Sequence, residues 1–194
     1  MKKKTLMSIV LLAIIGTSAV FAQAPTLDKL RFLDDKNGGY EVAAKDKKTI
    51  SGEVVIPDTY NGKPVRKLFA KAFEDSSITS VIIPNSVNVI GSGAFTSCVG
   101  LTSVTIPASV TKIEHSAFIG WGKTMNLTSV TFQGSNITMD KGVRTFDGDL
   151  DAKYQAGGAG TYTRDVGGKV WTKVGGVALC PTCGQPLPAG FKLP

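Results

Sequence analysis

The side chains best suited to chemistry are three cysteines and a single histidine. Cys180 and Cys183 enclose two residues, a spacing at which a pair of thiolates supplies half of a tetrahedral zinc site. The sequence contains no second pair at such a spacing to supply the other half. We therefore expect an intramolecular disulfide first, which an oxidising compartment favours, and keep zinc shared between two chains and free thiols as alternatives.

Catalysis by a serine or cysteine nucleophile would have to be centred on His115, because the chain has no other histidine. The sequence identifies no partner for this histidine, and we expect it to be exposed. Cys98 belongs to an apolar pattern described below and is expected to be a small buried side chain. The glycines at 157, 158 and 160 are followed by Thr161 instead of the Lys-Ser/Thr pair of a phosphate-binding loop. We therefore predict no enzymatic activity and no cofactor.

The chain has 194 residues, of which 42% are hydrophobic and 19% charged, so it can bury a core and fold. Three lysines at 2–4 precede an apolar run at 6–21, the pattern of a secretory signal peptide. We expect cleavage after Ala22, or second after Ala24, so that residues 1–22 are removed and no membrane anchor remains. A retained anchor is the alternative, disfavoured because no positive cluster follows the run.

Removal of the signal peptide changes the charge balance. The formal net charge of +7 becomes +4, with 19 positive against 15 negative side chains, because residues 1–22 contain three lysines and no acid. So small and scattered a charge argues against nucleic acid as a partner.

A short segment recurs along the middle of the chain. Residues 78–84 (Ile-Thr-Ser-Val-Ile-Ile-Pro) return at 101–107 (Leu-Thr-Ser-Val-Thr-Ile-Pro), 23 positions later, and at 127–132 after a further 26. A looser copy lies at 54–57. A period near 23 with one short β-branched segment per unit predicts a solenoid that climbs one strand spacing per turn.

Alternation along each strand predicts which side chains point inward. The inward strand positions are Val54, Val81, Val104, Val130, Ile56, Ile83, Ile106 and Phe132. A second internal stack is expected from the pairs Ala72 and Phe73, Ala94 and Phe95, and Ala117 and Phe118. Each strand should end at a proline, since proline cannot donate the next ladder hydrogen bond. These prolines are Pro57, Pro84 and Pro107.

These positions resemble the BspA-like leucine-rich repeats, also called the Treponema pallidum type, whose unit runs roughly L-x-x-V-x-I-P-x-x-V-x-x-I-G-x-x-A-F-x-x-C. Residues 101–118 match this unit, and the resemblance extends over 53–137. Two kinds of position depart from it. The Gly position holds Phe69 and Glu114, and the Cys position holds Asp75 or Ser76 in one unit and Trp121 in another.

The resemblance implies a leucine-rich-repeat solenoid, mainly β with irregular connections and a short parallel sheet on one face. It also implies a bacterial protein, secreted or displayed at the cell surface, that binds other proteins without catalysis. Host matrix and cell-surface proteins are among the partners implied. The periplasm is the alternative location. The alternative functions are a structural component of the cell envelope and a metal or redox role for the C-terminal cysteines.

The flanks of the repeats predict β-hairpin caps, because the terminal turns of a solenoid otherwise expose their cores. Two apolar runs separated by Asn37 and Gly38 predict a hairpin within 23–52. Residues 138–173 predict a short helix from Asp149 followed by a second hairpin. Residues 174–194 carry Pro and Gly without any repeat and are expected to form a flexible tail that holds the two cysteines.

The outward strand positions form two columns, which we expect to be a concave partner-binding surface. They are Glu53, Val55, Ser80, Ile82, Ser103, Thr105, Ser129 and Thr131. Four parallel strands give a face roughly 15 Å wide and about 200 Å² in area, well below the roughly 800 Å² per partner of a stable interface. We therefore expect the loops at 60–64 and 120–126 to extend it. A solvated Ser/Thr face without any partner is the alternative.

Overall fold

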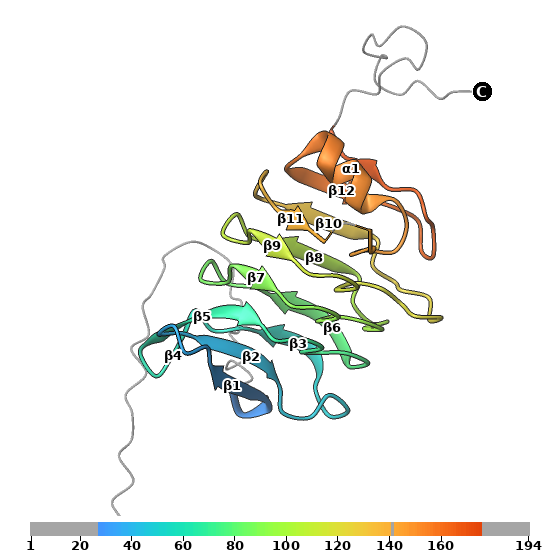
Figure 1. Ribbon diagram of the computed structural model, residues 1–194. Helices are drawn as coiled ribbons and strands as arrows, with labels where there is room; N and C mark the ends of the chain where they lie inside the picture. Colours follow the sequence, from blue (N-terminus) through green and yellow to red (C-terminus); the bar gives the residue numbers. More distant parts are fainter. Residues whose placement is uncertain (1–26, 141, 176–194) are drawn as a thin grey trace, which may run out of the picture.

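The computed structural model describes residues 27–140 and 142–175. Within them the chain forms a stack of turns, and strands from successive turns line two opposite sides of the stack (Figure 1). The N-terminal hairpin covers one end of the stack, and a short helix with a second hairpin covers the other. The expected signal peptide, and Cys180 with Cys183, lie outside the described residues. None of the described helices is long and apolar enough to cross a membrane.

One side of the stack is a continuous parallel ladder. Its members, in order, are β2 (Tyr40–Ala44), β5 (Lys63–Leu68), β7 (Val89–Ile90), β9 (Lys112–Ile113) and β11 (Thr138–Met139). Strand β1 (Leu30–Asp34) pairs antiparallel with β2, and β4 (Thr59–Tyr60) pairs antiparallel with β5. The repeat pattern predicts one strand per turn and does not predict this second ladder, whose later members are only two residues long.

The other side carries the strands expected from the repeat, but its ladder is interrupted. Strand β3 (Ser51–Val55) pairs with β6 (Ser77–Ile82), and β8 (Ser103–Ile106) pairs with β10 (Ser129–Phe132), both in parallel. Strand β12 (Gly160–Thr163) then adds to β10 antiparallel, and β13 (Thr172–Lys173) adds to β12. Among the described strands, β6 and β8 are not hydrogen-bonded neighbours.

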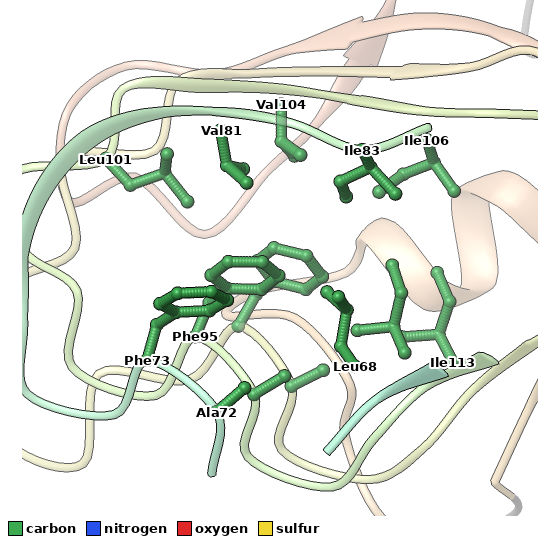
Figure 2. Packing of buried hydrophobic residues seen from close by; sticks show 14 of the residues in the cluster. Leu68, Ala72, Phe73, Val81, Ile83, Phe95, Leu101, Val104, Ile106 and Ile113 are labelled. Atoms are coloured by element: carbon green, nitrogen blue, oxygen red, sulfur yellow. The ribbon is translucent and has the colours of Figure 1, made fainter. Parts of the chain in front are cut away.

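The core lies between the two ladders and confirms the predicted inward register. Val54 is paired with Val81 and Val104 with Val130, and all eight predicted inward side chains are buried. The phenylalanine rings stack through the middle of the turns, as Figure 2 shows for Phe73 and Phe95 beneath the valine row. Phe146 extends this stack at 4.6 Å from Phe118, although it has no place in the repeat pattern.

The N-terminal end is covered by a 3₁₀ turn, Leu27–Lys29, and by the β1 and β2 hairpin. At the other end, α1 (Leu150–Gly157) follows Asp149, whose carboxylate accepts the amide N–H of Trp171 at 2.8 Å. Arg164 lies over the Trp171 ring and donates to the carbonyls of Leu127, Asp147 and Gly168. These hydrogen bonds satisfy the Nε and Nη1 groups of the buried arginine and connect the terminal hairpin to the last turns.

Candidate partner-binding surface

The eight outward positions predicted to bind a partner lie on one side of the stack, and we call them the strand face. Pairing brings Glu53 beside Ser80 and Val55 beside Ile82 on β3 and β6. On β8 and β10 it brings Ser103 beside Ser129 and Thr105 beside Thr131. Glu53, Ile82, Ser103 and Thr105 are exposed, and the other four are half-buried. The break between β6 and β8 divides the strand face into two halves.

A groove of about 540 Å³ lies over this break, at the C-terminal ends of β3, β6 and β8. Three predicted residues line it, namely Val55, Ile82 and Thr105, together with prolines 84 and 107 that end two of the strands. Two inward side chains beneath the groove, Val81 and Ile83, are each 7% exposed, whereas Val54 is 0% exposed. The missing pairing thus opens the core surface into the groove.

Ile82 is the apolar centre of this groove, with 51% of its surface exposed. Its neighbours in the lining include Val55, Thr105 and Gln133. An exposed large aliphatic side chain beside two prolines offers a partner apolar surface, and the surrounding Thr, Asn and Gln side chains offer hydrogen bonds. The groove is therefore suited to a peptide or loop with a mixed apolar and polar surface.

The side that carries the strand face is wider than the repeats alone predict. Strand β12 continues the sheet beyond β10, and the hydroxyl oxygens of Thr131 and Thr161 lie 2.9 Å apart. With β13, six strands span roughly 24 Å, and their outward surface is on the order of 300 Å². This is still below the roughly 800 Å² of a stable interface, so strands alone do not make a tight site.

Neither loop expected to extend the strand face reaches the groove. Residues 60–64 form a tight hairpin in which Tyr60 pairs with Lys63 of β5, on the opposite ladder (Figure 1). The Tyr60 ring stacks on Phe32 with centroids 3.9 Å apart, so this loop packs onto the N-terminal hairpin. Residues 120–126 precede β10, whereas the groove is lined by residues at the C-terminal ends of its strands. The expectation for residues 60–64 is therefore wrong, and the expectation that residues 120–126 extend the strand face, at the other ends of the strands, stays a prediction.

The sequence identifies no partner for His115, but the structure places it in a row with Ser92 and Asp140. The Ser92 hydroxyl lies 2.7 Å from Nε2 of His115, and the Asp140 carboxylate lies 3.4 Å from Nδ1. Ser92 and His115 are 23 positions apart and occupy the same place in consecutive turns. That periodicity is the signal by which their contact was predictable.

The row has the order of a Ser-His-Asp triad, but the backbone amides beside its serine, which could stabilise an oxyanion, are already engaged. The Ser92 amide donates to the Glu114 carboxylate at 2.9 Å, and the Gly93 amide donates to the His115 carbonyl at 3.0 Å. The His115 amide in turn donates to Asp140 at 3.1 Å. Glu114 and Asp140 thus occupy the position at which the repeat usually has glycine. Each carboxylate accepts a hydrogen bond from a backbone amide of the preceding turn.

The charge of Asp140 fits this capping role. Burial acts to raise the pKa of its carboxyl, but the hydrogen bond from the His115 amide and the nearby Lys112 ammonium outweigh it, so the pKa is lowered. The carboxylate is therefore ionised at neutral pH and holds the amide of the turn below. We interpret the row as a stabilising element of the repeat.

Cys98 is buried as expected and has no exposed surface. Its thiol donates to the Phe73 carbonyl at 2.9 Å and lies 3.5 Å from the Ser76 hydroxyl, which identifies Ser76 as its equivalent in the preceding turn. Burial raises the pKa of the thiol to about 11, so the reactive thiolate is suppressed. The described residues contain no group of three or more His, Cys, Asp or Glu side chains placed to hold a metal ion.

Comparison with known proteins agrees with the geometry of the turns. The model of the BspA type leucine rich repeat region matches residues 60–147 with six copies. Residues 60–147 are therefore a BspA-type leucine-rich repeat region. No curated protein sequence matches the chain. Leucine-rich repeats of this family generally mediate protein interactions, and the BspA-type repeats here have the same solenoid form.

Two solved structures are similar to the BspA-type repeats. The Treponema pallidum leucine-rich repeat protein is 26% identical, with a TM-score of 0.50, and the match covers 58% of this chain and 51% of that one. A leucine-rich cell surface protein from Faecalibacterium prausnitzii A2-165 is 28% identical, with a TM-score of 0.42, over 54% of this chain and 30% of that one. The chain thus spans about half the length of the Treponema protein.

Proposed function

We propose that this protein is an exported bacterial module, secreted or displayed at the cell surface, that binds another protein through the strand face and catalyses no reaction. The observation that carries the proposal is the groove over the β6 and β8 break, because it gathers Val55, Ile82 and Thr105 around an exposed apolar centre. The BspA-type repeats support a role in protein interaction. The apolar run at 6–21 after three lysines supports export.

The small area of the strand face favours weak binding by each copy. Avidity from many copies displayed together then supplies useful strength without any further contact. Adhesion to a host matrix or cell-surface protein has this character, since many copies face one extended target. We therefore propose adhesion as the form that the binding takes.

Binding is tested by replacing Ile82 and Thr105 together with lysine, which places two charges in the groove. Beads that display many copies of the wild type or the variant are compared on immobilised collagen, laminin and fibronectin. A matched control places lysines at Thr111 and Thr138, which are exposed at turns of the opposite ladder. We expect the groove variant to lose attachment by about tenfold or more and the control to attach like the wild type.

Equal attachment by a folded groove variant would move the site away from the strand face. If no matrix protein retains the wild-type beads, the structural alternative is examined by size exclusion, where self-association of the processed chain would support an envelope component. Export is examined separately. N-terminal sequencing of the protein recovered outside the cytoplasm should begin at Gln23, and an N-terminus that retains residues 1–22 would contradict cleavage.

A further inference from the structure

Trp121 occupies a position that is buried in the other turns of the stack. The equivalent residues, Ser76 and Cys98, are 2% and 0% exposed and contact one another inside the stack. Trp121 is instead 71% exposed, in the loop before β10. A large aromatic ring in water forgoes the burial that usually stabilises it, so the fold does not explain its presence.

The backbone conformation at Trp121 is also unfavourable for a bulky residue. Trp121 and Gly122 have φ of 44° and 86°, and the amide of Lys123 donates to the carbonyl of Gly120 at 3.0 Å, which is the pattern of a type I′ turn. Such turns favour Asn-Gly, because a bulky side chain is strained at positive φ. The chain uses that pair in the tight hairpin between β4 and β5, where Asn61 and Gly62 have φ of 48° and 75°. Seven described non-glycine residues have positive φ, exposed Lys71 and Asp75 among them, and Trp121 carries the bulkiest side chain of the seven. Its strain is therefore the one that we connect with a function.

Two hollows meet at this tryptophan. One, of about 250 Å³, is mainly polar and includes Lys123, Arg164 and Lys169 in its lining. The other, of about 430 Å³, includes Ile119, Val143 and Arg144. Val143 is itself exposed, so apolar surface continues from the Trp121 ring into the second hollow. Trp121, Gly122 and Asp147 line both hollows.

The charge that these hollows present is positive. Their linings contain four basic side chains and one acidic side chain, that of Asp147. The Lys123 ammonium also pairs with the exposed carboxylate of Asp75, which lies outside both linings, so basic side chains still outnumber acidic ones here. The Asp147 carboxylate already accepts the Gly120 amide at 3.1 Å and lies 4.0 Å from the Lys169 ammonium. Arg144 is exposed and forms no ion pair with any residue that the structure describes. A ligand that fits must therefore bring negative charge.

We propose that Trp121 and the two hollows beside it bind an acidic segment of another protein in which carboxylates alternate with apolar side chains. A carboxylate of that segment lies in the first hollow, beside Lys123 and Lys169, and an adjacent apolar side chain packs against Val143 and Ile119 in the second. The Trp121 ring covers the segment between them. Tryptophan and arginine are the residues that most often carry binding energy at such sites.

A sulfated polysaccharide would satisfy the positive charge and stack on an exposed ring, but it has no apolar side chain for the second hollow. The apolar lining therefore favours protein. This surface is also distinct from the strand face, because neither hollow shares a lining residue with the groove that contains Ile82. Loss of one surface is thus expected to leave the other intact.

The tryptophans provide a direct assay. The chain contains two, and the other, Trp171, is 1% exposed beneath Arg164, so a change in exposed-tryptophan emission reports Trp121. The probe is a short synthetic peptide in which Glu alternates with Leu and Phe. We expect it to shift the emission to the blue and to protect Trp121 from acrylamide quenching. Matched peptides with Lys for Glu, or Ser for Leu and Phe, and heparin should do neither.

Variants separate binding from folding. Trp121→Asn should weaken binding of the fluorescein-labelled acidic peptide about tenfold or more, with an unchanged or higher melting temperature because Asn suits the turn. Lys123→Glu with Lys169→Glu should also lose the acidic peptide, whereas Ile82→Lys should bind it like the wild type. The proposal is overturned if heparin binds and the acidic peptide does not, if no peptide affects Trp121, or if Trp121→Asn lowers the melting temperature by several degrees.

Discussion

The ring of Phe95 lies nearly parallel to that of Phe118 one turn further on, with centroids 5.0 Å apart and planes inclined by 18°. Phe73 covers the opposite face of Phe95 at 5.5 Å. Phe95 is therefore enclosed on both faces and has no exposed surface. No neighbouring side chain is free to fill its place, because each ring of the stack is already held by its own turn.

Replacement of Phe95 by alanine should accordingly lower the free energy of unfolding by about 3 to 5 kcal/mol, through lost burial and the cavity left behind. Urea denaturation measures the change. Thr105→Ala, an exposed change on the strand face, is the control and should stay within about 0.5 kcal/mol of the wild type. A melting temperature for Phe95→Ala within a few degrees of wild type would mean that the stack contributes little to stability.

The inward register was predictable from sequence because Val81 and Val104 recur at the repeat period within alternating strands. The second ladder was not predictable from the sequence, since a two-residue strand such as β7 is too short to show alternation. The break between β6 and β8 was also hidden, because both strands carry the same repeat pattern. Phe146 follows Phe118 by 28 positions and has no Ala before it, so its place in the stack depends on the path of the chain after β11.

The candidate binding surfaces likewise have features that the sequence predicted and features that it did not. Alternation predicted that Val55, Ile82 and Thr105 point outward, but the groove between them arises from strand pairing, which no local pattern encodes. The exposure of Trp121 was equally hidden. Its position in the repeat indicates a buried residue, and only the geometry of the turn at Gly120 directs the ring outward.

Cys98 predicts a specific loss of stability in alkali. Burial raises the pKa of its thiol from an ordinary value of 9.0 to about 11 in the folded protein. Below pH 9 the thiol is protonated in both states and the native contact is retained. Between pH 9 and 11 the unfolded chain ionises first, so the free energy of unfolding should fall by about 2 to 3 kcal/mol.

Comparison with Cys98→Ser isolates this contribution, because Ser76 already occupies the equivalent place and a hydroxyl does not ionise in this range. Both chains should carry Cys180→Ser and Cys183→Ser so that only one thiol differs. Denaturation at pH 8 and at pH 11 gives the difference between them. Parallel pH profiles for the two chains would show that burial of Cys98 does not hold its proton.

Ser92 should be unreactive despite its contact with His115. Its own amide and that of Gly93 are engaged by Glu114 and by the His115 carbonyl, so neither amide is available to an oxyanion that develops on a substrate. A fluorophosphonate probe should leave the protein unlabelled under conditions that label a serine protease. Labelling that disappears in Ser92→Ala would instead establish a nucleophile and contradict the non-catalytic function.

A chain that ends at Val174 should fold like the full-length protein. Trp171 is the last buried side chain of the described residues, and the amide of Val174 still donates to the Thr161 carbonyl at 2.7 Å. The terminal hairpin is therefore complete before the two distal cysteines, and the truncated chain should keep the full-length melting temperature. Because Cys180 and Cys183 supply only two of four zinc ligands, the purified monomer should also hold no stoichiometric zinc by elemental analysis. Unfolding on truncation, or one zinc per monomer that Cys180→Ser removes, would show that the C-terminal segment contributes to the fold.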